Sequence, residues 1–211
     1  MLFDCPPPTS LANIPATDCP VKWDQIQKIA FGRKVDTPRF NSTVGEGAKP
    51  ITEQATWTPL LAAEDSTKIV ISPFFSSFAI PNGEPVKTGG NDNTTLNGIA
   101  ELQGGSSVVV PFTIKNASAA TMRALRALCA ETQIQPGETN LEGYFFNINN
   151  SIIYDERDEK IQGFEIYNLF VPDVMTDGYN ANNQYQCSFE LRFGWSEYHK
   201  MVKANFDPRK L

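Results

Sequence analysis

At 211 residues the chain is long enough to bury a hydrophobic core, and we expect one main domain. Its formal net charge of −6 excludes general binding of nucleic acid in a basic groove, because such binding neutralises phosphates with Lys and Arg. An acidic surface is still compatible with lining a conduit for DNA, since repulsion prevents the polyanion from sticking. We therefore expect no sequence-specific nucleic-acid contact and allow only passive passage of DNA.

The N-terminus, MLFDCPPPTSLANIP, has neither a basic stretch nor a sustained apolar run. No later segment reaches the roughly 20 apolar residues that span a bilayer. We expect synthesis in the cytoplasm and no membrane partner. The four cysteines are few for a chain of this length, so a disulfide scaffold is not expected.

Residues 1–22 are rich in proline, which fixes φ and removes a hydrogen-bond donor. We predict an extended arm that needs a partner surface to become ordered. Cys5 and Cys19 can pair or share a metal, but their spacing matches no familiar zinc pattern and the chain has one histidine, so two ordinary thiols are favoured. The candidate assembly contacts in this arm are Cys5, Pro6, Pro7 and Pro8.

The predicted main domain covers residues 23–198. Its first segment, 23–31, fits a short helix or a strand, and we favour the strand. A helix of one or two turns is predicted within 52–61, with Thr52 or Thr56 as its N-cap. The β-rich runs 67–71 and 74–80 are predicted to form a pair of strands before the turn at Pro81-Asn82-Gly83.

Residues 87–105 form the longest stretch of low hydrophobicity and are bounded by Gly-Gly pairs. We predict a long mobile loop or a two-stranded flap. Its polar cluster lacks the alternating carboxylates and the distal Glu of a calcium loop, so turn-forming hydrogen bonds are the favoured role. The candidate assembly contacts in this loop are Asn91, Asp92, Asn93 and Thr94.

The sequence predicts one amphipathic helix, over about 117–133, after a buried strand at 107–114 whose Pro111 indicates an edge or a bulge. Met122, Leu125, Leu128 and Cys129 recur at helical spacing and define its buried face. Asn116 or Ser118 can cap its first turn, and Pro136-Gly137 stops it. One helix between two β-rich halves favours a sandwich or a sheet over a βαβ array.

The second β-rich half begins with a hairpin at 143–154 that turns at Asn147–Asn150. The charge run 155–160 is interpreted as a solvated turn. The strongest strands are 163–171 and 185–195, and the latter alternates apolar and polar side chains. A long connection, 172–184, joins them.

Residues 199–211 are predicted to be a polar tail, with Phe206 as a candidate assembly contact. The predicted fold class is therefore mainly β. It is a β-sandwich or barrel-like sheet with one packed helix, a long loop and extended terminal arms.

Catalytic chemistry is not evident in the sequence. The one histidine, His199, lies in the predicted tail with nothing to orient it, and the Gly-Gly pairs are not followed by a phosphate-cradling helix. Carboxylates alone would have to act as acid and base. We expect no enzyme, no cofactor and no metal.

Three stretches, ATWTPLLAAEDSTKIVISP, TGGNDNTTLNG and FELRFGWSE, resemble virion proteins of tailed bacteriophages, in particular phage or prophage structural proteins of the Bacteroides group. Tail tube subunits are similar in plan, with a β-sandwich, one packed helix, a long loop or hairpin, and arms that reach neighbouring subunits. The resemblance implies a virion localisation after assembly in the cytoplasm of the bacterial host. It also implies homo-oligomeric rings in contact with other virion proteins.

In this hypothesis, subunits close a ring by joining sheets edge to edge, and the loop and the N-terminal arm cross to adjacent rings. A capsid decoration protein or a head-to-tail connector is the alternative within virions. The alternative from another class is a carbohydrate-binding module or a glycosidase-like β protein that stacks sugars on Trp57, Tyr179 or Trp195.

Overall fold

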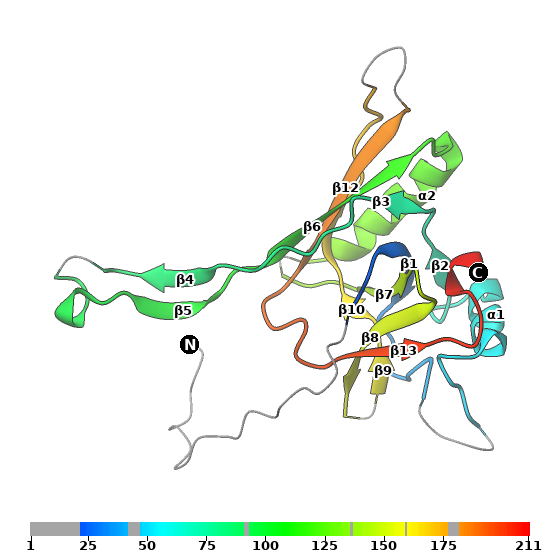
Figure 1. Ribbon diagram of the computed structural model, residues 1–211, viewed down its shortest axis with the longest axis horizontal. Coiled ribbons are helices and arrows are strands. Elements are labelled where there is room, and N and C mark those ends of the chain that lie inside the picture. Colours follow the sequence, from blue (N-terminus) through cyan, green and yellow to red (C-terminus); the bar gives the residue numbers. More distant parts are fainter. Residues whose placement is uncertain (1–21, 42–46, 91–92, 136, 159, 177–181) are drawn as a thin grey trace.

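The computed structural model describes residues 22–41, 47–90, 93–135, 137–158, 160–176 and 182–211. Within these ranges the chain is mainly β, with three antiparallel sheets and two α-helices (Figure 1). The predicted fold class is confirmed, and none of the described sheets closes into a barrel.

The largest sheet, sheet A, follows the order β13-β8-β7-β1-β2, with β9 beside β8 and β10 beside β7. Its strands are β1 (Ile26–Arg33), β2 (Ile69–Ile71), β7 (Leu141–Asn147), β8 (Ser151–Arg157), β9 (Lys160–Gln162), β10 (Phe164–Glu165) and β13 (His199–Lys203).

Sheet B follows the order β11-β12-β6-β3, and a third sheet pairs β4 with β5. Their strands are β3 (Phe75–Ser76), β4 (Pro85–Thr88), β5 (Glu101–Gly105), β6 (Val108–Lys115), β11 (Tyr167–Phe170) and β12 (Gln184–Leu191). The helical elements are α1 (Gln54–Ala62), η1 (Leu96–Gly98), α2 (Ala119–Cys129), η2 (Ala130–Thr132) and η3 (Pro208–Lys210).

Strand β7 is buried along its whole length. Because successive side chains of a strand point to opposite faces, Phe145 faces the cluster shared with sheet B and α2, whereas Tyr144 and Phe146 face a second cluster around Trp57 of α1. Sheet A is therefore the middle layer of the molecule, covered by sheet B and α2 on one face and by α1 and the C-terminal segment on the other.

Sheet B buries one face only. In β12 the side chains of Cys187, Phe189 and Leu191 are buried and the residues between them are half-buried. The opposite face of β6 carries Val109, which is 52% exposed. This alternation confirms the pattern predicted for 185–195, although the strand ends at Leu191.

Helix α2 confirms the predicted amphipathic helix. The Ser118 side chain accepts a hydrogen bond from the Thr121 backbone N–H, as an N-cap does. Met122 and Leu125 are buried against both sheets, while Leu128 and Cys129 are only half-buried. The helix thus fills the space beside β11 and contributes to the core between the sheets.

The segment before β4 differs from its prediction. The runs 67–71 and 74–80 do not pair with each other, because β2 joins sheet A beside β1 and β3 joins sheet B beside β6. Helix α1 begins after Glu53 without a side-chain cap, so neither Thr52 nor Thr56 has the predicted role. The strand at 23–31 is confirmed as β1.

Pro111 lies in β6, between β12 and β3, but β3 pairs only with Thr113 and Ile114, so Pro111 is at a local edge of sheet B, as predicted. It is opposite Ser188 of β12 in regular register, and its carbonyl oxygen accepts from the Ala79 N–H on the other side. The N and O of one residue in an antiparallel strand point to the same side. The missing N–H therefore points to the side where β3 has already ended, so no ladder hydrogen bond is lost.

The apolar run 163–171 is divided between two sheets. Strand β10 pairs with β7 in sheet A, and after Ile166 strand β11 pairs with β12 in sheet B. A Cβ at Gly163 would lie 2.8 Å from the backbone N of Gly143, so the crossing requires a residue without a side chain. This segment therefore connects the two sheets on one side of the sandwich. The single continuous strand predicted for 163–171 is wrong.

The C-terminal residues are part of the fold and not a polar tail. Strand β13 pairs with β8 from His199↔Asp155 to Lys203↔Ser151. Arg209 donates to Gln27 Oε1 at 3.0 Å and to Asn150 Oδ1 at 3.1 Å. The chain end is thereby held against sheet A.

The charge run 155–160 was predicted to be a solvated turn, but it begins inside the sheet. Asp155 is 2% exposed and accepts from Gln162 Nε2 at 3.2 Å. Its Oδ2 also lies 2.7 Å from Arg157 Nε, an ion pair without hydrogen-bond geometry. The turn itself is confined to the residues around Asp158. The neighbouring turn predicted at Asn147–Asn150 is confirmed between β7 and β8.

We predict that Leu125→Ala lowers the free energy of unfolding by about 2–5 kcal/mol, because it leaves a cavity between the sheets. Arg123→Ala, on the exposed face of α2, is expected to stay within about 0.5 kcal/mol of the unchanged protein. Urea unfolding followed by circular dichroism measures both. Equal small effects would show that α2 is not packed through Leu125.

Candidate functional site

The most distinctive surface feature is the hairpin of β4 and β5, which projects from the body of the molecule (Figure 1). Only Ser106 and Ser107 separate β5 from β6, so the hairpin continues the line of β6. It extends beyond the end of β12, whose last residue, Leu191, pairs with Val108 of β6. Its base is held by the Ser106 N–H, which donates to the Glu84 carbonyl at 2.8 Å. The flap predicted within 87–105 is therefore a two-stranded hairpin.

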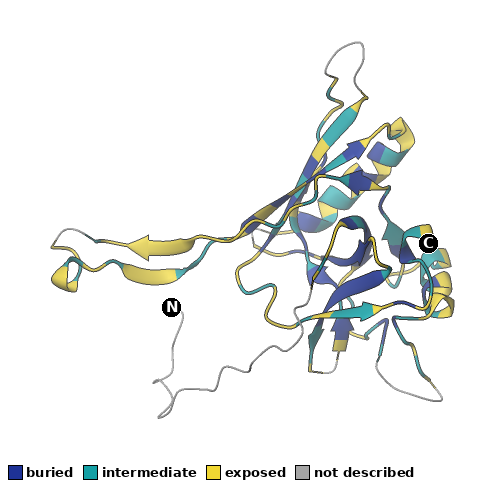
Figure 2. Cartoon of the chain, viewed as in Figure 1, coloured by how far each residue is buried: buried dark blue, intermediate teal, exposed yellow. Residues whose placement is uncertain are grey.

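The hairpin exposes almost every side chain it carries (Figure 2). Its ladder is short and irregular, because β5 has one residue more than β4 between the pairs Val86↔Gly104 and Lys87↔Leu102. Four large apolar side chains on it are exposed to solvent, namely Val86 46%, Leu96 83%, Ile99 69% and Leu102 56%. Exposed apolar side chains gathered on one projection are typical of a surface that contacts a partner.

This apolar character was missed in the sequence, where the stretch was described as hydrophilic. Leu96, Ile99 and Leu102 are spaced three residues apart among glycines and asparagines. The regular spacing of these three apolar residues is the one sequence signal that could have indicated a contact surface in this stretch.

The candidate contacts from the sequence have different positions. Asn93 and Thr94 lie near the far end of the hairpin and are exposed. Asn91, Asp92 and the arm residues Cys5, Pro6, Pro7 and Pro8 lie outside the described residues. Phe206 is half-buried and packs against the cluster around Trp57, and its role as an assembly contact stays a prediction.

The aromatic residues proposed for sugar stacking do not form a common surface. Trp57 is fully buried and donates its indole N–H to the Ile51 carbonyl at 2.8 Å. Trp195 is half-buried, with its ring centroid 5.3 Å from that of Phe164. Tyr179 lies outside the described residues. Trp57 is therefore wrong as a carbohydrate contact.

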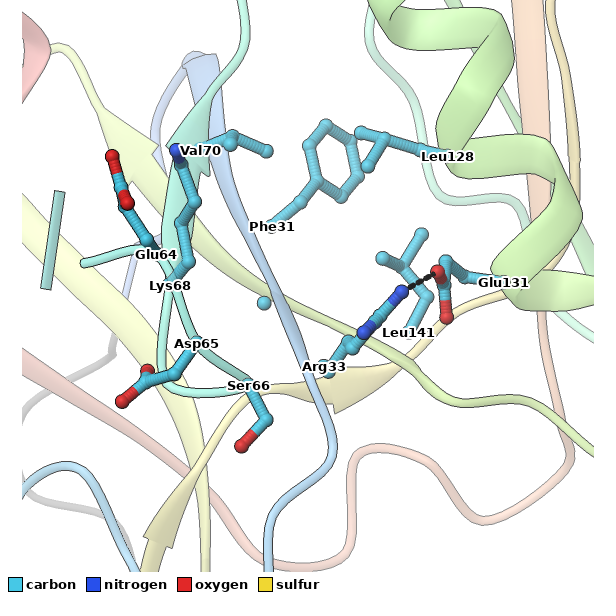
Figure 3. A pocket seen from close by; sticks show the side chains of 11 residues that line it. Phe31, Arg33, Glu64, Asp65, Ser66, Lys68, Val70, Leu128, Glu131 and Leu141 are labelled. Atoms are coloured by element: carbon cyan, nitrogen blue, oxygen red, sulfur yellow. Dashed lines mark hydrogen bonds and ion pairs between the residues drawn. The ribbon is translucent and has the colours of Figure 1, made fainter. Parts of the chain in front are cut away.

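A depression of about 280 Å³ lies between the start of β2, the end of β1 and helix α2 (Figure 3). Phe31, Val70 and Leu128 form its apolar floor, and the ion pair between Arg33 and Glu131 borders it. Asp65 at the rim accepts from both the N–H and the hydroxyl of Thr67, which lowers the pKa of its carboxyl and keeps it ionised. The arrangement fits an apolar side chain, with charges only at the edge.

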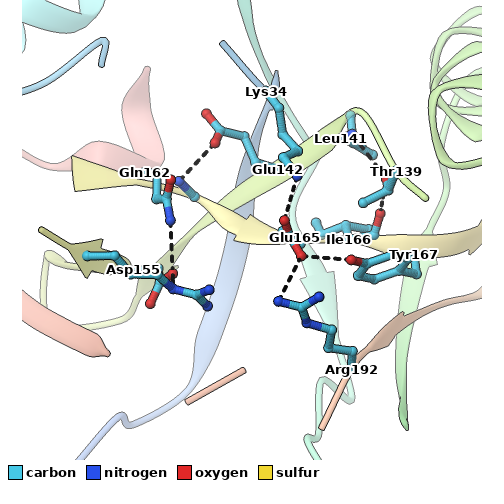
Figure 4. Close-up of polar contacts among 12 residues, drawn as sticks. Lys34, Thr139, Leu141, Glu142, Asp155, Gln162, Glu165, Ile166, Tyr167 and Arg192 are labelled. Atoms are coloured by element: carbon cyan, nitrogen blue, oxygen red, sulfur yellow. Dashed lines mark hydrogen bonds and ion pairs between the residues drawn. The ribbon is translucent and has the colours of Figure 1, made fainter. Parts of the chain in front are cut away.

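Among the carboxyl groups of the described residues, Glu142 on β7 has the most perturbed pKa. Its Oε1 lies 2.5 Å from Arg39 Nη1. Its Oε2 accepts from the Gly163 N–H, a bond drawn as a dashed line from Glu142 in Figure 4. Burial raises the pKa of Glu142 to about 7, against the effect of the Arg39 guanidinium, which lowers it. The Tyr144 hydroxyl donates to the same carboxyl.

Arg39 is 4% exposed and connects three parts of the chain. Besides Glu142, it donates to the carbonyls of Arg33 at 2.6 Å, Ser66 at 2.9 Å and Thr67 at 2.8 Å. Apart from Glu142, these partners are backbone carbonyls. Neither Arg39 nor Glu142 lines the depression of Figure 3. We therefore interpret this pair as a structural element despite its perturbed pKa.

A second polar group surrounds Glu165, on β10. Its carboxyl accepts from Lys34 Nζ at 2.5 Å and from the Tyr167 hydroxyl at 2.7 Å, and Arg192 lies 3.7 Å away (Figure 4). Burial alone would raise the pKa of Glu165, but Lys34 and Tyr167 outweigh it and lower that pKa. Burial and the bond to Glu165 raise the pKa of Tyr167 to about 12. Neither group is poised to transfer a proton near neutral pH.

The two described cysteines are free thiols. Burial raises the pKa of Cys187 to about 12 and also raises that of Cys129, which keeps both protonated at neutral pH. In the described part of the chain, no three His, Cys, Asp or Glu side chains gather as metal ligands. No helix among these residues is long and apolar enough to cross a membrane.

No family model matches the sequence, and no curated protein matches it significantly. Among solved structures, a chain from the cryo-EM structure of the anti-feeding prophage baseplate, 6-fold symmetrised, is similar at 13% sequence identity. The match covers 90% of this chain and 100% of that chain, with a TM-score of 0.27. This TM-score is well below the value that marks a shared fold, so neither fold nor function is inferred from it.

We predict that Arg39→Met lowers the free energy of unfolding by about 3–5 kcal/mol near pH 8, because a buried carboxylate loses its counter-charge. Without the guanidinium, the folded-state pKa of Glu142 rises above its present value of about 7. A raised carboxyl pKa favours the folded state at low pH, and that advantage is lost as pH rises. The extra loss in the variant therefore grows between about pH 7 and pH 9.

Urea titrations at several pH values measure this effect. The control is the double variant Arg39→Met/Glu142→Leu, in which neither charge is buried. It is expected to recover most of the stability and to lose the pH-dependent difference. If Arg39→Met lowers the free energy of unfolding by the same amount at every pH, ionisation of Glu142 is not the cause of the loss.

Proposed function

We propose that this chain is a non-enzymatic structural subunit of a tailed-phage virion or a particle derived from one, and that it assembles into stacked rings as a tail tube subunit. The observation that carries the proposal is the projecting hairpin, whose four large apolar side chains are between 46% and 83% exposed. The resemblance of the three sequence stretches to virion proteins points in the same direction.

The free energy of a two-stranded hairpin supports a role between subunits. Hairpins of this size are marginally stable on their own, because ordering the backbone costs about 1–2 kcal/mol per residue. The side chains of β4 are all exposed, so they contribute little burial to offset this cost. A partner that covers Leu96, Ile99 and Leu102 would supply the missing apolar contacts.

The sheet edges suggest where a ring would close. On the α2 side, the Leu169 N–H of β11 donates to Thr132 Oγ1 of η2, which covers that edge of sheet B. In sheet A, β13 pairs only with β8 among the described strands. We propose β13 as the edge that meets a neighbouring subunit. Its exposed Lys200 and Lys203 would limit pairing with unrelated strands.

Negative-stain electron microscopy of the purified protein tests the proposed function. Stacked rings or tubes are expected over a range of protein concentrations. A single closed ring that does not stack would favour the head-to-tail connector, and monomers at every concentration would contradict the assembly.

We predict that Leu96→Asp/Ile99→Asp abolishes stacking and leaves the subunit folded, because both side chains are mostly exposed in the free subunit. Sedimentation velocity measures assembly, and urea unfolding is expected to show a change below about 0.5 kcal/mol. The matched control is Val174→Asp, at a side chain that is 48% exposed outside the hairpin. Equal loss of assembly in the control would remove the special role of the hairpin.

We also predict that limited proteolysis cuts residues 87–105 in the monomer and not in the assembly. The glycines and asparagines of this segment provide little burial to hold it closed in a free subunit. Mass spectrometry of the fragments locates the cuts. Equal protection in both states would show that the hairpin is stabilised by its own subunit.

A further inference from the structure

An open groove of about 620 Å³ lies at the base of the hairpin. Four segments that are distant in the sequence form it: the segment before β1, the turn before β4, the link from β5 to β6 and the connection from β12 to β13. The side chains that give it its character are Trp23, Pro81, Phe193, Trp195, Glu197 and His199.

The groove is mainly aromatic. The rings of Trp23 and Trp195 meet edge to face, with centroids 5.5 Å apart, and His199 lies 5.2 Å from Trp23. Phe193 is 54% exposed and covers Gly105 so closely that a Cβ there would lie 2.0 Å from its ring. Within the described part of the chain, neither Trp23 nor Trp195 uses its indole N–H in a hydrogen bond.

Aromatic grooves with available indole donors suit one class of ligand in particular. Proline-rich segments form polyproline II helices, which need little further ordering to bind and whose carbonyl oxygens are not used internally. The rings of such a segment pack between aromatic side chains, and its carbonyls accept from donors such as an indole N–H. The groove has few charges, so it does not select a charged ligand.

The chain carries a segment of this chemistry. Residues 1–21 contain Pro6, Pro7 and Pro8 in succession, with Pro15 and Pro20 after them, and include no Lys or Arg. The described chain begins at Lys22, directly before Trp23 in the groove wall. We propose that the segment around Pro6–Pro8 of one copy binds in the aromatic groove of a second copy. This inference rests on the proposed assembly and assigns a receiving site to its N-terminal arm.

A second copy is favoured over the same chain because the proposed assembly brings copies of the chain together. Residues 9–22 number 14 and include two prolines, and extended they can reach about 45 Å. Exchange between copies gives each subunit one donated segment and one filled groove, which suits a repeating assembly.

The native Cys5, next to Pro6, provides a direct test. In a Cys19→Ser background, Ser196→Cys places a thiol at an exposed position of the groove. Mild oxidation of the full chain is expected to join Cys5 of one copy to this new thiol of the next, giving a ladder of linked oligomers on non-reducing gels. Cys5→Ser in the same background removes the ladder, and Thr58→Cys, at an exposed position of α1, is the matched control.

The outcomes separate this inference from the proposed function. A link within one chain, or equal linkage with Thr58→Cys, would overturn the exchange between copies. Rings in the microscope without a link to Ser196→Cys would overturn the groove assignment alone. Linked oligomers without rings would support the groove and overturn the tube.

A peptide-binding measurement provides a second test, which does not depend on the formation of rings. The probe is a peptide of residues 1–15 with Cys5→Ser, added to the full chain that carries Pro6→Ser, Pro7→Ser and Pro8→Ser. Saturable quenching of tryptophan fluorescence is expected, at least tenfold weaker for a peptide with the same three serines. Phe193→Asp should weaken binding, whereas Phe170→Asp, 59% exposed elsewhere, should not. Equal affinity of both peptides would overturn the proposal.

Discussion

The burial of both faces of β7 is the constraint on which the rest of the structure depends. Every residue from Leu141 to Asn147 is buried, so sheet A needs a cover on each side. Sheet B and α2 supply one cover, and α1 with the C-terminal segment supplies the other. The same burial explains why Glu142 on this strand requires Arg39, since an unpaired carboxylate in that position would be costly. Arg39 also donates to the Thr67 carbonyl, so the ion pair holds the loop before β2 against the segment that carries Arg39.

Segments that do not cover sheet A extend from the body. Strand β6 belongs to the cover, but the hairpin that precedes it extends beyond the last pair with β12 and has no layer beneath it. The Phe193 side chain of the body lies against its base, over Gly105. The apolar side chains near the tip remain exposed. The hairpin that we propose as a contact surface is therefore a part of the chain that does not contribute to the core.

Local signals in the sequence predicted the elements whose pattern is local. Helix α2 shows a 3.6-residue period and a Ser118 cap, and β12 alternates, so both could be recognised. The split of 163–171 at Ile166 could not be predicted, because both halves are apolar and only their partners differ. Likewise β13 is half polar, and its pairing with β8 joins residues 44 to 52 positions apart, from His199↔Asp155 to Lys203↔Ser151. Asp155 looked like part of a solvated run because its burial depends on that same neighbour.

The candidate contact surfaces could be predicted only in part for the same reason. The proline-rich segment and the glycine-bounded hairpin are continuous in the sequence, whereas the aromatic groove is assembled from residues that span Trp23 to His199. Copies that each carry a net charge of −6 repel one another over about 10 Å at 0.1 M salt, so contact between them must come from short-range burial. Both proposed contacts meet this requirement. The hairpin tip offers leucine and isoleucine, and the groove joins aromatic rings to a segment that carries no basic residue.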